Sequence, residues 1–220
     1  MNPAALILTS CFAALLIAHL LSELYGNKLV RKITKPLLMP VLAGIYALSA
    51  EKTINLIICA LLLGAVGDVF MMFSARKKCF LSGAGAFLLG HICYITFFVS
   101  SGGNFSALSW THLLLVLPQG LILFVWCLPK IWEKMGWMQL PLVSYGIVLF
   151  IMVSSTIFRS DNYTGTSFWL PYIGAVLFSF SDAMIVVDRF HEKITNAKVY
   201  IMLTYAAGQF LIVAGLIPAG

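Results

Sequence analysis

The feature that most constrains this chain is the alternation of long apolar stretches with short polar breaks along its whole length. A helix needs roughly 20 apolar residues to cross the hydrocarbon core of a membrane, and the stretches are of that order. Hydrophobic residues occupy 61% of the 220 positions and charged residues only 10%, which excludes a soluble globule with an ordinary charged surface. The sequence therefore predicts an integral membrane protein made of helices.

The apolar stretches predict an all-α fold, a compact bundle of eight transmembrane helices. The breaks between them are short and leave no room for a soluble domain, so we expect a single transmembrane domain over residues 1–220. The expected helices lie near residues 3–22, 33–50, 54–74, 81–100, 112–129, 137–158, 168–188 and 198–217.

The basic residues indicate how the helices are oriented. Of the 14 lysines and arginines, 12 lie in or beside the first, third, fifth and seventh breaks, and only Lys52 and Arg159 lie on the other side. Because basic residues are retained on the cytoplasmic side, this split predicts eight passes with both termini outside, in the inner membrane of a bacterium. The net charge of +6 then reflects membrane topology, and no nucleic-acid partner is expected.

Two carboxylates inside predicted spans are the main candidates for function. Asp68 and Asp182 each lie six residues before the predicted cytoplasmic end of a helix, at Ser74 and Asp188, or roughly 9 Å deep. An ionisable side chain in a membrane helix costs several kcal/mol and needs a partner, a wet cavity or a function. Equal depth would let the two carboxylates meet, although a lone membrane aspartate can also serve as a structural hydrogen-bonding group.

A pair of poorly solvated carboxylates can supply an acid and a base at neutral pH, since burial and mutual repulsion favour protonation of one of them. The same arrangement cleaves glycosidic bonds through an oxocarbenium-like state. The four histidines are scattered across depths, and no Cys or His spacing is typical of a zinc site. The residues leave three classes open: a lipid hydrolase, a proton-coupled transporter of lipid or small molecules, and a non-catalytic lipid-binding protein.

Several short motifs, in order and on the expected helices, resemble the YhhN/TMEM86 family, whose characterised members are lysoplasmalogenases. They are Lys35-Pro36, Gly67-Asp68, Gly90-His91 followed by Tyr94, Ser181-Asp182, and Tyr205 with Gln209. The resemblance spans nearly the whole chain.

The resemblance implies hydrolysis of the vinyl ether of a lysoplasmalogen to a fatty aldehyde and glycerophosphoethanolamine or glycerophosphocholine. It implies Asp68 and Asp182 as the catalytic residues and a lysophospholipid in membrane lipid as the partner, with no metal or organic cofactor. The residues expected to bind substrate are Lys35, near the headgroup phosphate, and His91, Tyr94, Tyr205 and Gln209, near the water or the glycerol oxygens. The oligomeric state is not indicated.

The charge asymmetry leads to a test of topology. A reporter that is active only outside the cytoplasm, fused after Gly220, should be active, because eight passes return the chain to the side on which it began. A reporter that is active only in the cytoplasm should be silent at the same position. The reverse pattern would rule out the eight-pass arrangement.

Overall fold

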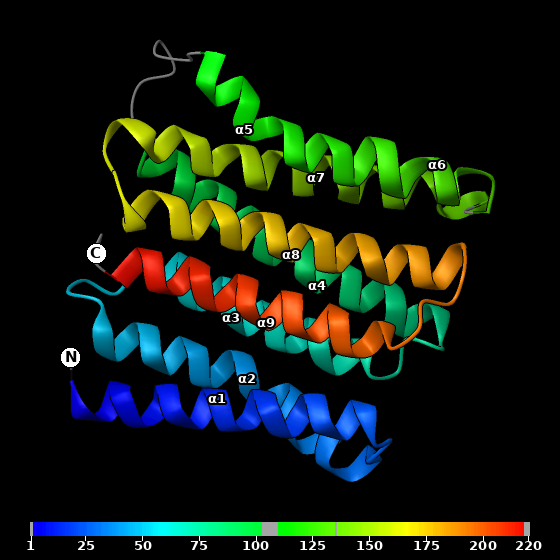
Figure 1. The fold of residues 1–220 in the computed structure, drawn as a ribbon, viewed down its shortest axis with the longest axis horizontal. Helices are drawn as coiled ribbons and strands as arrows, with labels where there is room; N and C mark the ends of the chain where they lie inside the picture. The colour runs from blue at the N-terminus through cyan, green and yellow to red at the C-terminus, as the bar shows by residue number, and fades with distance from the viewer. Residues whose placement is uncertain (1, 103–109, 135, 218–220) are drawn as a thin grey trace. The chain divides into compact units, whose positions relative to one another are not determined.

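The computed structural model describes residues 2–102, 110–134 and 136–217. Within these ranges the chain is helical and contains no strand, so the predicted all-α class is confirmed. The α-helices, labelled in Figure 1, are α1 (Pro3–Leu24), α2 (Lys28–Ser49), α3 (Asn55–Met71), α4 (Lys77–Ser100), α5 (Trp110–Gly120), α6 (Leu128–Ile131), α7 (Gln139–Ile157), α8 (Thr166–Phe190) and α9 (Ala197–Leu216).

In the part of the chain that the structure describes, six helices are long and apolar enough to cross a membrane. The shorter α3 is also apolar, whereas α2 contains four basic residues and two internal prolines and is not among the six. The six are Pro3–Leu24, Lys77–Ser100, His112–Lys134, Gly136–Asp161, Thr166–Phe190 and Ala197–Leu216. These helices suit a protein that crosses a membrane several times, while the count of eight spans and the side of each terminus stay predictions.

The helix α2 begins at Lys28, five residues before the start that hydropathy predicted. The side chain of Asn27 caps it, because its Oδ1 accepts hydrogen bonds from the backbone amides of Leu29 and Val30, each at 3.2 Å. The basic residues of the first turn lower the local hydropathy without preventing a helix. Hydropathy alone therefore places the start of this helix too late in the sequence.

The helix α3 ends at Met71, three residues before its predicted end at Ser74, and α8 continues two residues past its predicted end, to Phe190. After Met71 the chain tightens into turns, with hydrogen bonds such as the amide of Phe73 to the carbonyl of Phe70 at 3.0 Å. Counted from the observed ends, Asp68 lies about 4.5 Å and Asp182 about 12 Å inside its helix. Helix ends alone thus do not establish the equal depth that the sequence predicted.

The chain divides into two compact units, residues 1–97 with 216–220 and residues 98–215, which we call unit 1 and unit 2. In unit 1, α2 packs against both α1 and α3. The helices α3 and α4 approach closely through glycine, since a Cβ added to Gly67 would lie 2.7 Å from the ring of Phe87. A Cβ on Gly90 would lie 3.3 Å from the backbone oxygen of Ala60. Small residues of this kind let membrane helices pack with their backbones close together.

In unit 2, α7 lies beside α8, and α8 lies beside α9 (Figure 1). The backbones of α8 and α9 nearly touch: a Cβ on Gly174 would lie 2.5 Å from the carbonyl oxygen of Gly208. Side-chain hydrogen bonds connect the helices of this unit as well. The Ser181 hydroxyl donates to the carbonyl of Ile201 at 2.8 Å, and the Tyr172 hydroxyl donates to that of Leu115 at 2.7 Å.

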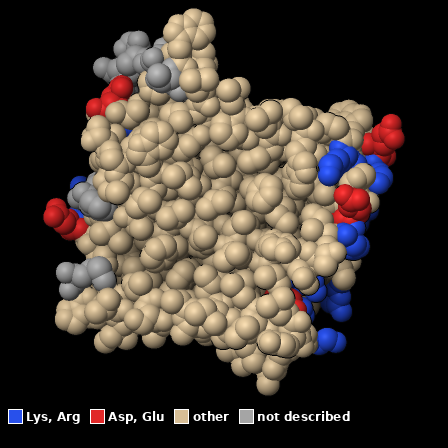
Figure 2. Space-filling model, viewed as in Figure 1, with Lys and Arg blue, Asp and Glu red and all other residues tan. Residues whose placement is uncertain are grey.

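Charged side chains of unit 2 gather where α6 ends and α8 turns into α9. Lys134 Nζ lies 2.9 Å from His191 Nδ1, and Lys130 Nζ lies 3.9 Å from Glu192 Oε1. In Figure 2 the Lys and Arg side chains at this turn lie at the margin of a face that is otherwise almost free of charge. The fifth and seventh breaks of the sequence are therefore at the same end of unit 2.

The contact between α8 and α9 predicts that two glycine-to-alanine substitutions will change the stability of the protein by very different amounts. Gly174→Ala should destabilise the protein by about 1–3 kcal/mol, because the added methyl group meets backbone that cannot move aside. Gly120→Ala is the control, since a Cβ there meets nothing within 4 Å. Thermal unfolding in detergent measures both. Equal melting temperatures would show that α8 and α9 are not in backbone contact at Gly174.

Candidate functional site

Asp68, on α3 in unit 1, is buried, with 2% of its surface exposed. Lys35 Nζ, from α2, lies 3.6 Å from Asp68 Oδ1, and the lysine side chain is 18% exposed. An opposite charge at this distance offsets part of the cost of burying a carboxylate. The structure therefore places Lys35, which was expected to meet a headgroup phosphate, beside one of the predicted catalytic residues.

His91 and Tyr94 lie on α4, in the same unit, and both are buried. His91 follows Gly90, the residue at which α4 comes close to the backbone of α3. Glycine at position 90 favours this close packing, because a Cβ there would lie 3.3 Å from the backbone oxygen of Ala60 and would require the helices to shift slightly. Unit 1 thus holds four of the seven predicted site residues, and Lys35 and Asp68 form an ion pair among them.

A second polar cluster in unit 1 joins α1 to α2. His19 Nδ1 lies 2.9 Å from the hydroxyl of Thr34, and His19 Nε2 lies 3.8 Å from Glu23 Oε1. Glu23 Oε2 in turn lies 3.4 Å from Arg31 Nη1. These contacts close the turn between the two helices and satisfy polar groups at the C-terminal end of α1.

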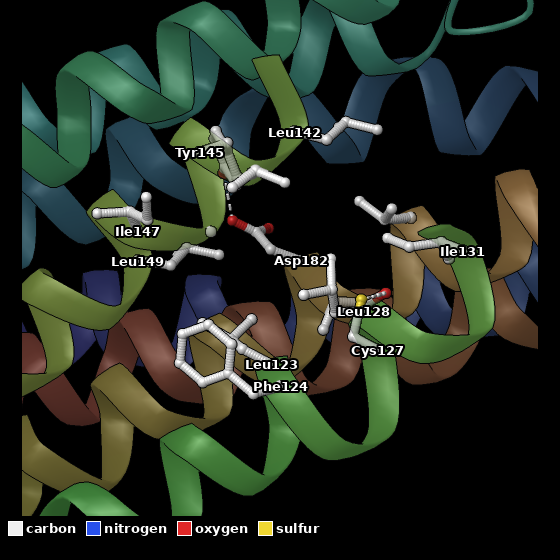
Figure 3. A pocket seen from close by; sticks show the side chains of 14 residues that line it. Leu123, Phe124, Cys127, Leu128, Ile131, Leu142, Tyr145, Ile147, Leu149 and Asp182 are labelled. Carbon is white, nitrogen blue, oxygen red and sulfur yellow. Dashed lines mark hydrogen bonds between the residues drawn. The ribbon is translucent and has the colours of Figure 1, made fainter. Parts of the chain in front are cut away.

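Asp182, on α8 in unit 2, is 4% exposed and accepts a hydrogen bond from the hydroxyl of Tyr145 on α7. Figure 3 shows the phenol and the carboxylate pointing toward one another between the two helices. A phenol is an uncharged donor, so Asp182 has a different environment from Asp68, whose partner is a cation.

Asp182 and Tyr145 also line a cavity of about 60 Å³. Three segments of unit 2 form its walls: the helix that runs through α5 and α6, the helix α7, and the helix α8 (Figure 3). The other lining residues are apolar or small: Leu123, Phe124, Cys127, Leu128, Ile131, Leu142, Val143, Gly146, Ile147, Leu149, Ala183 and Val186. A single carboxyl–phenol pair is thus set into an apolar wall.

Tyr205 and Gln209, the two predicted site residues on α9, are both buried in unit 2. The ring of Tyr205 packs edge-on against Phe178 of α8, with 5.2 Å between the ring centroids. The hydrogen bond from Ser181 to the backbone of α9 holds the residue next to Asp182. The contact between α8 and α9 thereby positions Asp182, Tyr205 and Gln209 in one unit.

Sequence reasoning missed Tyr145. The motifs named the tyrosines at positions 94 and 205 but gave no reason to single out the one at position 145. The depth of the two residues in their helices could have indicated the contact. The helices α7 and α8 are antiparallel neighbours. Tyr145 lies six residues after the start of α7, and Asp182 lies eight residues before the end of α8. Polar residues at such matching depths on consecutive helices can meet.

The predicted pair is divided between the units, with Asp68 in unit 1 and Asp182 in unit 2. That the two carboxylates face each other stays a prediction. Among the described residues, no three His, Cys, Asp or Glu side chains lie together as metal ligands would.

The seven predicted site residues all fall within the stretch that a known family covers. The model of the YhhN family matches residues 30–216, most of the chain. The chain belongs to the YhhN family. This confirms the resemblance that the short motifs around Asp68, His91 and Asp182 indicated.

Curated relatives of this YhhN-family chain carry a common name. The protein named lysoplasmalogenase TMEM86B from Homo sapiens is 31% identical over 159 residues, which cover 70% of this chain and 59% of that protein. A protein named lysoplasmalogenase from Mycobacterium bovis is 28% identical over 204 residues, 88% of this chain and 73% of that protein. The chain thus spans less than two thirds of the length of the human relative. No solved structure matches it significantly.

The ion pair of unit 1 predicts a stability effect. Lys35→Met should destabilise the protein by up to about 3–5 kcal/mol, because it removes the cation beside a buried carboxylate. Adding Asp68→Asn to Lys35→Met should recover part of the loss, which unfolding in detergent can measure. The control is Lys193→Met, which breaks the exposed pair with Asp188 at 3.1 Å and should cost little. If Lys35→Met and Lys193→Met had the same effect, the buried pair would contribute no more than a surface one.

Proposed function

We propose that this chain is a membrane-embedded lysoplasmalogenase. It hydrolyses the vinyl ether bond of a lysoplasmalogen to a fatty aldehyde and glycerophosphoethanolamine or glycerophosphocholine, with Asp68 and Asp182 as the acid and base. The observation that carries the proposal is the presence of two buried aspartates, each held by a polar partner, in a family whose curated relatives are named lysoplasmalogenases. We further propose a single domain of eight spans with both termini outside, in a bacterial inner membrane.

The chemistry of a vinyl ether calls for these groups. One carboxylic acid donates a proton to the carbon of the double bond that is farther from the ether oxygen, which leaves an oxocarbenium ion on the nearer carbon. Water adds to that carbon and gives its proton to the other carboxylate, forming a hemiacetal. The second carboxyl group then returns its proton to the glycerol oxygen as the hemiacetal breaks its bond to that oxygen, and the hemiacetal hydroxyl gives its proton to the first carboxylate as the aldehyde is released. One water molecule is consumed and the acid is restored.

The surroundings of the two aspartates suit a charge that develops in a poorly solvated place. In water, a carboxylate stabilises a nearby oxocarbenium ion only weakly. In an apolar site the same attraction between the two charges is much stronger. The ion pair with Lys35 supports Asp68 as the residue that faces the oxocarbenium ion as an anion. Tyr145 holds one oxygen of Asp182 and so orients the carboxyl group.

The remaining predicted residues have positioning roles in the proposal. His91 and Tyr94 in unit 1, and Tyr205 and Gln209 in unit 2, carry donors and acceptors suited to water and to the glycerol oxygens. Lys35 was expected to meet the phosphate of the headgroup. In the proposal its ammonium group contacts the phosphate and at the same time stays paired with the carboxylate of Asp68. No metal or organic cofactor enters the proposed reaction.

Purified protein in detergent, given a lysoplasmalogen, should release a fatty aldehyde, which is measured directly by mass spectrometry. Asp68→Asn and Asp182→Asn should each lower kcat by at least about 100-fold, the range expected on loss of a general acid or base. Asp188→Asn is the matched control, because Asp188 lies in the last turn of α8 and pairs with the exposed Lys193. Its kcat should stay near that of the unaltered chain.

Melting temperatures of the same variants separate a loss of chemistry from a loss of fold. Folded Asp68→Asn or Asp182→Asn protein with near-normal turnover would contradict the acid and base roles. An unaltered chain that binds lysoplasmalogen and releases no aldehyde would contradict the proposed function as a whole.

A further inference from the structure

The cavity at Asp182 has a feature that the acid–base scheme does not use: its wall is almost wholly apolar. Of its 14 lining residues, the polar ones are Asp182, Tyr145 and the weakly polar Cys127, whose Sγ lies 3.9 Å from the carbonyl oxygen of Ala183. A site for glycerol hydroxyls or phosphate would need several hydrogen-bonding groups. The cavity therefore favours a hydrocarbon ligand, with a carboxyl group at its edge.

The proposed reaction places hydrocarbon next to the proton donor. In a vinyl ether, the carbon that accepts the proton is the one bonded to the alkyl tail, whereas the other carbon is bonded to oxygen. The acid must approach within hydrogen-bonding reach of the accepting carbon, so the first carbons of the tail must lie beside the acid. Asp182 lines such an apolar cavity.

We infer that the cavity at Asp182 is the subsite for the first carbons of the alkenyl chain, and that Asp182 is the proton donor. This inference rests on the proposed function and deepens it. Tyr145 is a positioning residue, because its hydroxyl holds Asp182 Oδ2 at the cavity wall (Figure 3). The subsite thereby selects for the shape of the chain close to the double bond.

The volume limits how much of the chain enters. A cavity of about 150 Å³ lined by Leu, Ile and Phe can hold benzene, and this cavity is about 60 Å³. It has room for only a few carbons, so the rest of the tail lies outside it. The subsite should therefore be sensitive to branching next to the double bond and insensitive to branching near the end of the tail.

Gly146 offers a way to fill the cavity. It lines the cavity on α7, and a Cβ added there meets no atom within 4 Å. Gly146→Leu should place a side chain in the space that the proposal assigns to the alkenyl chain. Gly120→Leu is the matched control in unit 2, since a Cβ there also meets nothing within 4 Å and Gly120 does not line the cavity.

The experiment measures kcat/KM for aldehyde release in detergent with three lysoplasmalogens: a straight chain, a chain with a methyl branch on the carbon next to the double bond, and a chain with a methyl branch near its end. The unaltered protein should discriminate at least tenfold against the first branch and not against the second. Gly146→Leu should lower kcat/KM for the straight chain at least tenfold, while Gly120→Leu should leave it within twofold.

Each result bears on the subsite separately from the reaction. Release of aldehyde from all three substrates at equal rates would overturn the subsite and leave the hydrolase proposal standing. Full activity of Gly146→Leu would overturn it as well. The branched series on the unaltered chain needs no variant, so it decides the matter even if Gly146→Leu fails to fold. No aldehyde from any substrate would instead overturn the proposed function.

Discussion

The cost of placing a polar group away from water governs this structure. Inside a membrane protein, water does not solvate an unpaired charge or hydrogen-bonding group. A polar side chain within a helix is therefore stabilised by a partner from a neighbouring helix. Asp68 meets Lys35, Asp182 meets Tyr145, and Glu23 meets Arg31. Arg159, which is fully buried, donates to the carbonyl of Ser167 and lies over the ring of Tyr163. These contacts determine which helices can be neighbours.

Close approach of the helices makes such pairing possible. Lipid tails are as apolar as leucine, so helices in a membrane gain little from burying apolar surface and associate through tight packing. Close contacts of α3 with α4 and of α8 with α9 involve glycines: a Cβ would come within 3.0 Å of the neighbouring helix at Gly67, Gly174 and Gly208, and within 3.3 Å at Gly90. The same contacts hold the predicted site residues of α4 and α9 against the helices that carry the two aspartates.

The two aspartates differ in their surroundings, and the difference favours a different catalytic role for each. One carboxylate sits beside an ammonium group, which suits an anion that faces a developing cation. The other is held by a phenol at the edge of an apolar cavity, which suits a donor that must reach a hydrocarbon carbon. The sequence alone left these roles interchangeable, because both residues are aspartates at similar places in apolar runs.

The sequence by itself determined the all-α class and the existence of most helices, and it indicated the two aspartates as candidate functional residues. It could do so because hydropathy and the rarity of charge within spans depend on each segment alone. It placed the start of α2 too late and the end of α3 too late, because caps and tight turns depend on single side chains and backbone geometry. It overlooked Tyr145, and it did not indicate that Arg159, in the turn after α7, is buried. Only the tertiary structure paired Asp68 with Lys35 and Asp182 with Tyr145, because such pairs form between helices, at positions that no single helix specifies.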